Sequence, residues 1–99
     1  LFDFSKLKNY EIQLQRKPVD IRSLTHIVLQ VSRSMVGEKD LVVSMDISPE
    51  LPAVSADEDR LQQILYNLVG NAIKFTEVGI VTVKAKQEGY KVVVSVGYI

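Results

Sequence analysis

The stretch "DEDRLQQILYNLVGNAIKFTEVGIVTV", residues 57–83, carries the strongest apolar periodicity in the chain. Seven apolar residues recur there at helical spacing: Leu61, Ile64, Leu65, Leu68, Val69, Ala72 and Ile73. They predict an amphipathic helix with one buried face. Ser55 and Glu58 have capping-box spacing at its start, and Gly79 is expected to end it.

Two asparagines and a lysine lie on the opposite side of this predicted helix. At 100° per residue, Asn67, Asn71 and Lys74 fall within about 60° of one another, facing away from the apolar stripe. A solvated helix face is the ordinary interpretation, although asparagine is a mediocre helix former. Amide oxygens suit Mg²⁺, and a lysine one turn away suits phosphate oxygens. The residues alone leave both interpretations open.

The chain before this helix predicts a strand, a helix and a second strand. Alternating apolar residues indicate a strand over 10–16, which Pro18 is expected to end. Asp20 is placed to cap a helix over 21–35. Alternation returns over 41–47, which predicts the second strand.

A connection and a hairpin complete the predicted order of elements. Two prolines make residues 48–54 a connection between the second strand and the central helix. Residues 81–85 and 91–96 read as two strands joined by a turn at "QEGY". The fold class that follows is an α/β (α+β) two-layer sandwich, with two helices packed on one face of a mixed sheet.

Composition limits the classes of function. Twelve basic residues balance twelve acidic ones, so no strong field favours nucleic acid, and we expect no nucleic-acid partner. The chain has no cysteine, which excludes disulfides and thiolate sites. No apolar run is long enough to span a bilayer. The chain begins at Leu1, so we interpret it as a piece of a longer protein; we expect a cytoplasmic domain, with a membrane anchor elsewhere in the parent left open.

Residues 57–83, and above all "NLVGNAIKFT", resemble the N-box region of sensor histidine kinases. The preceding "PVDI", "LVVSMDI" and "PELPAV" match the usual run-up of that family, and "DFSKL" resembles the end of its dimerisation helix. The resemblance implies a truncated Bergerat ATP-binding sandwich, shared with gyrase-type ATPases and an Hsp90-type chaperone. Residues 1–9 are then the end of the dimerisation helix or a linker, and residues 10–99 part of the ATP-binding domain.

The resemblance also implies roles for the polar residues of the helix. Asn71 would coordinate the Mg²⁺ that bridges the ATP phosphates, Lys74 would contact those phosphates, and Asn67 would help orient the catalytic site. The gyrase-type relatives typically have glutamate at the position of Asn67, so asparagine favours the kinase branch. The implied cofactors are ATP and Mg²⁺. The implied partners are the dimerisation and phosphoacceptor domain of the same or a sister chain, in a homodimeric parent, and a response regulator receiver domain.

Two features depart from the family pattern. The family has an Asp-x-Gly-x-Gly motif whose aspartate binds the adenine amino group. This motif is absent here, and Gly97 stands after Val96 where the aspartate is expected. His26 lacks the sequence context of a phosphoacceptor and is expected on the surface. We therefore expect a protein-histidine kinase as the parent, with weak or no ATP binding and no self-phosphorylation by this chain alone. The alternative is a nucleotide-incompetent interaction module that pairs through an open sheet edge after Lys91.

Two residues of the motif are interpreted further. Phe75 falls toward the apolar side of the wheel and is expected in the core. Gly70 either lets the helix pack closely or leaves room for a ligand, and the sequence does not decide between the two. Asp57, Glu58 and Asp59 are interpreted as a charged first turn that suits the helix dipole, and not as a metal cluster.

Overall fold

The computed structural model describes residues 15–99 of the chain. Its elements, in chain order, are β1 (Arg16–Val19), α2 (Ile21–Ser32), the 3-10 helix η1 (Arg33–Met35), β2 (Asp40–Ile47), β3 (Val54–Asp57), α3 (Glu58–Phe75), β4 (Val78–Glu88) and β5 (Lys91–Tyr98). The segment expected as the end of a dimerisation helix, residues 1–9, lies outside the described residues, as does most of the strand expected over 10–16.

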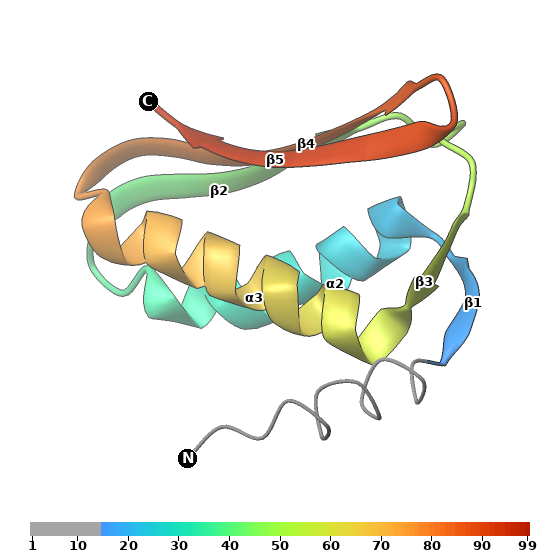
Figure 1. The fold of residues 1–99 in the computed structure, drawn as a ribbon. Helices are drawn as coiled ribbons and strands as arrows, with labels where there is room; N and C mark the ends of the chain where they lie inside the picture. The colour runs from blue at the N-terminus through green and yellow to red at the C-terminus, as the bar shows by residue number, and fades with distance from the viewer. Residues whose placement is uncertain (1–14) are drawn as a thin grey trace, which may run out of the picture.

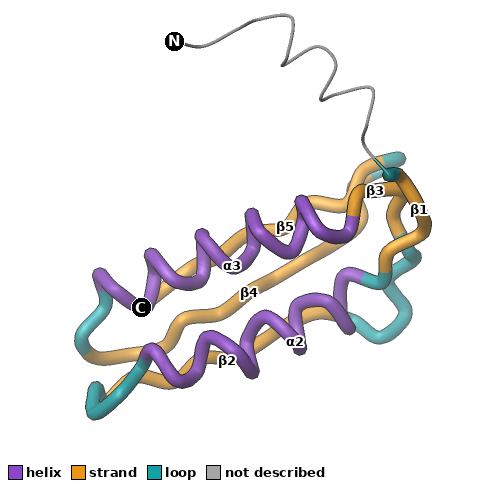
Figure 2. The backbone as a smooth tube through the Cα atoms, turned by 90° about the horizontal axis from the view of Figure 1, so that it is seen from below, coloured by secondary structure: helices purple, strands orange, loops and turns teal. Residues whose placement is uncertain are grey.

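The described residues form the predicted two-layer sandwich. Strands β2, β4 and β5 make a mixed sheet in that order, with β2 parallel to β4 and β4 antiparallel to β5. Both helices lie against one face of this sheet (Figure 1). Seen from the helix side, α2 runs along β2, and α3 runs beside it over the other strands (Figure 2). No helix among residues 15–99 is long and apolar enough to cross a bilayer.

The core lies between the helices and the inner face of the sheet. Alternate residues of the strands point inward, as a pleated strand requires. The buried side chains from β2 and β4 are Leu41, Val43, Ile47, Val81, Val83 and Ala85, and those from the helices are Ile21, Leu24, Val28, Leu29, Leu65, Val69, Ala72 and Ile73. The apolar stripes of both predicted helices therefore do form the core.

Some members of those stripes are not buried. Ile64 and Leu68 on α3 remain 55 % and 46 % exposed, and Ile27, Val31 and Met35 are similarly exposed. They lie at the margins of each stripe, where no further element among residues 15–99 covers the outer flanks of the helices. The expectation that all of them are core residues was too broad.

A two-stranded ribbon of β1 and β3 joins one end of the helices, and the sequence did not predict it. Pro18 does not end β1 but lies within it, opposite Ser55 of β3. A ribbon strand tolerates proline because one side of it needs no ladder hydrogen bond. Ser55 is therefore a strand residue, and the predicted capping box is wrong: Asp57 caps α3 by accepting a hydrogen bond from the Arg60 N–H at 3.2 Å. Val54, expected in a connection, begins β3.

The end of α3 also differs from the prediction. The helix ends at Phe75, because Thr76 adopts an extended conformation with φ −113° and ψ 119°. Gly79, expected to end the helix, instead lies within β4 at φ 130°. A Cβ atom at Gly79 would collide with the carbonyl oxygen of Ile99, which accepts a hydrogen bond from the Ile80 N–H at 3.3 Å. Because Gly79 has no side chain, the backbone of Ile99, the residue after β5, can form hydrogen bonds with the backbone of Ile80.

Candidate functional site

The polar ridge predicted on α3 is present. Asn67, Asn71 and Lys74 lie at positions i, i+4 and i+7 of one continuous helix, and all three side chains are exposed. Leu65 and Val69, between 0 and 1 % exposed, anchor the opposite face of the helix in the core. Among residues 15–99, no hydrogen bond engages the amide of Asn67 or Asn71. Both amide oxygens are thus available to a ligand.

Lys74 lies against the ring of its neighbour. Its Nζ atom is 5.4 Å from the centroid of the Phe75 ring, within the range of a cation–π contact. Phe75 is 73 % exposed, so the expectation that it belongs to the core is wrong. The reason is its position at the margin of the apolar stripe, on the same flank as Ile64 and Leu68. The polar ridge therefore borders an exposed apolar flank of the same helix.

Asn67 also lines a shallow hollow of about 440 Å³ with Asp59, Gln62, Gln63 and Tyr66. Asn71 and Lys74 lie further along α3 and do not line this hollow. The larger hollow of about 700 Å³ lies by β3 and the β4–β5 turn, where Tyr90 and Leu61 are among its lining residues. Neither Asn67, Asn71 nor Lys74 lines that hollow, so the ridge is the candidate site.

The donors on the ridge fit one kind of metal. Within residues 15–99 there is no group of three or more His, Cys, Asp or Glu side chains that could hold a metal by themselves. Mg²⁺ does not need such a group, since it commonly binds through one or two protein oxygens together with phosphates and water. A free amide oxygen at Asn71, with an ammonium at Lys74, suits a metal that arrives with a polyphosphate.

The acidic first turn of α3 makes contacts that stabilise the start of the helix. The Asp57 carboxylate accepts hydrogen bonds from the backbone N–H groups of Gln15 and Arg60, and these hold the pKa of Asp57 below its ordinary value. The side-chain hydrogen bond to Glu58, at 3.0 Å, raises the pKa of Lys17. Both contacts stabilise the N-terminal end of α3, as the helix-dipole interpretation of this turn predicts.

The C-terminal end of α3 is held by a residue that sequence reasoning missed. The Nζ atom of Lys39 donates hydrogen bonds to the backbone oxygens of Ile73 at 2.8 Å, Lys74 at 3.3 Å and Thr76 at 3.3 Å. It also lies 3.4 Å from the carboxylate of Glu77. The available signal was indirect: no glycine follows Phe75 closely enough to cap the helix.

His26 lies on α2 and is exposed, as predicted, beside Arg22, Ser23 and Met45. It is the single histidine of the chain and is not on the polar ridge. Asn67, Asn71 and Lys74 do not line the hollow that includes His26.

Comparisons with known proteins show which family the chain resembles. Residues 56–97 match the family model described as histidine kinase-, DNA gyrase B- and HSP90-like ATPase. The chain is 35 % identical over 85 residues to the aerobic respiration control sensor protein ArcB homologue of Haemophilus influenzae, covering 85 % of this chain and 26 % of that protein.

Two solved structures are also similar. One is full-length ShkA in complex with AMPPNP, at 40 % identity and a TM-score of 0.78, covering 85 % of this chain and 18 % of that one. The other is the histidine kinase ThkA in complex with the response regulator protein TrrA, at 25 % identity and a TM-score of 0.74, covering 93 % of this chain and 28 % of that one. The chain belongs to the histidine kinase-, DNA gyrase B- and HSP90-like ATPase family, and its similar relatives are histidine kinases.

Proposed function

We propose that α3 presents the metal- and phosphate-binding half of an ATP site, through which a parent sensor histidine kinase transfers a phosphoryl group to a histidine. The observation that carries this proposal is the ridge of Asn67, Asn71 and Lys74, whose amides are exposed and engage no other described side chain. The ATPase family of the chain and its kinase relatives support the same assignment.

Each residue of the ridge has a distinct role. The amide oxygen of Asn71 is the metal ligand, and the ammonium of Lys74 contacts the phosphates after leaving the Phe75 ring. That departure costs little, since an exposed cation–π contact is worth about 0.5–1 kcal/mol. Asn67, one turn earlier, orients the reacting phosphoryl group. Mg²⁺, when bound, supplies neutralisation of phosphate charge, and phosphoryl transfer is catalysed mainly by positioning and such neutralisation.

The placement of the ridge on α3 has an electrostatic consequence. Asn71 and Lys74 lie in the C-terminal half of the helix, where the backbone carbonyls concentrate negative charge. Such a helix end repels a bare phosphate and attracts a cation. A polyphosphate can therefore approach Asn71 only with its metal, and Lys74 offsets the rest of the repulsion. We expect phosphate binding here to depend strictly on Mg²⁺.

The partners belong to the proposal as well. ThkA was solved with a response regulator, and ShkA with AMPPNP, a non-hydrolysable ATP analogue. By analogy we propose ATP, a response regulator receiver domain, and a dimerisation and phosphoacceptor domain as the partners of the parent, in the cytoplasm where ATP is available. Because the chain spans 26 % of its H. influenzae relative, these activities concern the parent protein.

A second candidate function uses the edge of the sheet. Within residues 15–99, β5 pairs with β4 alone, so its other edge presents free backbone groups. Such an edge can pair with a strand of another chain. This interaction module needs no nucleotide, and it is favoured if the folded chain never responds to one.

The test is a backbone amide NMR titration of the chain with a non-hydrolysable ATP analogue, with and without Mg²⁺. We expect weak binding, with Mg²⁺-dependent shifts centred on Asn67, Asn71 and Lys74. Dispersed peaks that never move would reject the phosphate site and favour the edge strand of the second candidate. Addition of a labelled hydrolysable ATP should leave the chain unphosphorylated.

Two variants make this test specific. Asn71→Ala should weaken the Mg²⁺-dependent binding by about tenfold or more, because it removes the metal ligand. Gln30→Ala, which removes an exposed amide from α2, should change nothing. In the intact parent, Asn71→Ala should abolish kinase activity and leave the fold intact. A fully active parent carrying Asn71→Ala would reject the assignment.

A further inference from the structure

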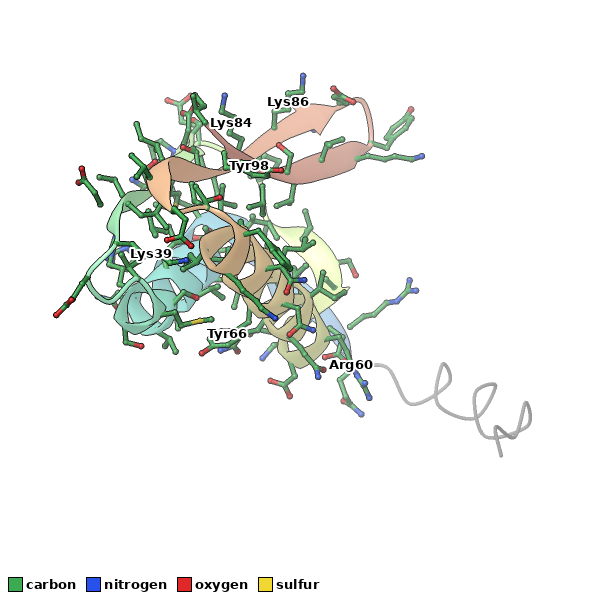
Figure 3. All side chains as sticks on the ribbon, turned by 90° about the vertical axis from the view of Figure 1, so that its left-hand side faces the viewer. Lys39, Arg60, Tyr66, Lys84, Lys86 and Tyr98 are labelled. Carbon is green, nitrogen blue, oxygen red and sulfur yellow. The ribbon has the colours of Figure 1, made fainter. Side chains whose placement is uncertain are left out.

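Lys39 reaches from the segment before β2 to the end of α3. Its ammonium donates to three backbone oxygens there, those of Ile73, Lys74 and Thr76, at 2.8, 3.3 and 3.3 Å. The Lys39 side chain is 25 % exposed, so most of it is packed against the protein. Figure 3 looks toward this end of the molecule and shows Lys39 lying between the end of α3 and the loop that leads to β2.

The end of α3 needs such a donor. The last carbonyls of a helix have no partner within the helix, and a glycine in a left-handed conformation commonly satisfies them. Here Thr76 is extended, so that arrangement is absent from α3. The three N–H groups of the Lys39 ammonium are shared by these three backbone oxygens and the Glu77 carboxylate. Its positive charge also lies at the negative end of the helix dipole.

The ammonium is held on a short and well-fixed segment. The Lys39 N–H donates to the Val36 oxygen at 3.2 Å, and the next residue, Asp40, begins β2 opposite Val78 of β4. Lys39 therefore ties the last turn of α3 to the starts of two neighbouring parallel strands. This turn is bonded both by the Thr76 N–H, which donates to the Ile73 oxygen, and by a side chain from more than thirty residues away.

We propose that Lys39 is a positioning residue for the phosphate-binding ridge. By holding the backbone of Ile73 and Lys74, it fixes the turn from which the Lys74 side chain projects, one turn beyond Asn71. Its charge also offsets the carbonyl charge that would repel phosphates from this end of α3. The link to phosphates rests on the proposed function, whereas the hold on the helix end does not.

The first experiment replaces Lys39 by methionine, which keeps the length of the side chain and removes the ammonium. Hydrogen bonds to a charged group are strong enough that amide hydrogen exchange of residues 73–77 should accelerate by about tenfold. Exchange in the middle of α3, over residues 62–66, should change much less. The carbonyl ¹³C resonances of Ile73 and Lys74 should move as their donor is lost. Lys86→Met, which removes an exposed lysine from β4, is the matched control and should leave residues 73–77 unchanged.

Rescue separates the ammonium from any general effect of substitution. Because the chain has no cysteine, Lys39→Cys can be alkylated at one site, in denaturant before refolding. A haloethylamine rebuilds an ammonium on a side chain of nearly the same length and should restore slow exchange at residues 73–77. Alkylation with iodoacetamide adds a neutral group and should not restore it. Equal exchange in the two alkylated proteins would overturn the proposal.

Nucleotide binding then tests the functional link. In the titration with Mg²⁺ and the ATP analogue, Lys39→Met should weaken binding by about tenfold, and the aminoethylated protein should regain it. Unchanged affinity would overturn the positioning role. If the unsubstituted chain itself does not bind, the proposed function fails and the link from Lys39 to phosphates fails with it. Unchanged exchange at residues 73–77 in Lys39→Met would instead reject the role of Lys39 by itself.

Discussion

The two ends of α3 are stabilised by different means. At the N-terminal end the helix uses its own neighbours: Asp57 caps it, Glu58 pairs with Lys17, and the β1–β3 ribbon leads directly into it. At the C-terminal end the helix depends on Lys39, a residue distant in sequence. The difference follows from what each end carries. If Lys74 binds phosphates, as proposed, its side chain cannot also cap this turn, and Lys39 supplies the donor instead.

The largest effect is expected from truncating a buried side chain in the middle of α3, on which both ends of the helix depend. Leu65, 1 % exposed, lies in the middle of the buried face of α3. Leu65→Ala should lower the free energy of unfolding by about 2–5 kcal/mol, because it removes buried methyl groups and leaves a cavity. Urea denaturation measures the change. Hydrogen exchange should show both ends losing protection together, and an effect confined to one end would contradict this.

Leu68→Ala is the matched control on the same helix. Leu68 is half-exposed, so the same truncation should lower the free energy of unfolding by less than about 1 kcal/mol. A cost equal to that of Leu65→Ala would mean that the flank carrying Leu68 is covered in solution.

A smaller effect on stability is expected from replacing the glycine within α3. Gly70 lies between Asn67 and Asn71, and a Cβ atom there would approach the flexible Met35 Cε atom at 3.4 Å. Gly70→Ala should therefore raise the free energy of unfolding by about 0.5–1 kcal/mol, since alanine is the better helix former. Thermal unfolding measures this stabilisation.

The same Gly70→Ala variant resolves what the sequence left open. If the glycine serves only close packing against Met35 of η1, Mg²⁺-dependent binding of the ATP analogue should be unchanged. Weaker binding in a more stable protein would show that the glycine leaves room for the ligand.

The sequence predicted the parts of this fold that depend on periodicity. The apolar stripe of α3, the alternation in β2, β4 and β5, and the exposure of Asn67 and Asn71 all follow from residue spacing in one element. The resemblance to histidine kinases added the family and the proposed roles of Asn67, Asn71 and Lys74, and those roles stay predictions.

What the sequence could not supply depends on contacts between elements. The β1–β3 ribbon is short and includes Pro18, so its alternation is weak and its partner strand looked like a connection. Phe75 appeared apolar and therefore buried, but its exposure is decided by which flank of α3 has a neighbour. Lys39 caps a helix end more than thirty residues away, and no local pattern reports such a contact.

The smallest expected effect is a loss of stability in acid that differs between the two ends of α3. Hydrogen bonds from backbone N–H groups hold the pKa of Asp57 below its ordinary value of 3.8, and those from Ser23 do the same for Asp20 at the start of α2. A lowered folded pKa means that each carboxylate stabilises the fold fully above about 3.8, and that this stability is lost as the pH falls through the folded value. Both of these carboxylates cap the N-terminal ends of helices. Acid should therefore loosen the N-terminal ends of both helices before the C-terminal end of α3, as amide exchange between pH of about 6 and about 3 can measure.

Asp57→Asn keeps a hydrogen-bond acceptor that does not titrate, so it should abolish the acid response at α3 and leave the response at α2. If the end of α3 held by Lys39 were instead the first to exchange, the N-terminal end would not be the one that depends on ionised caps.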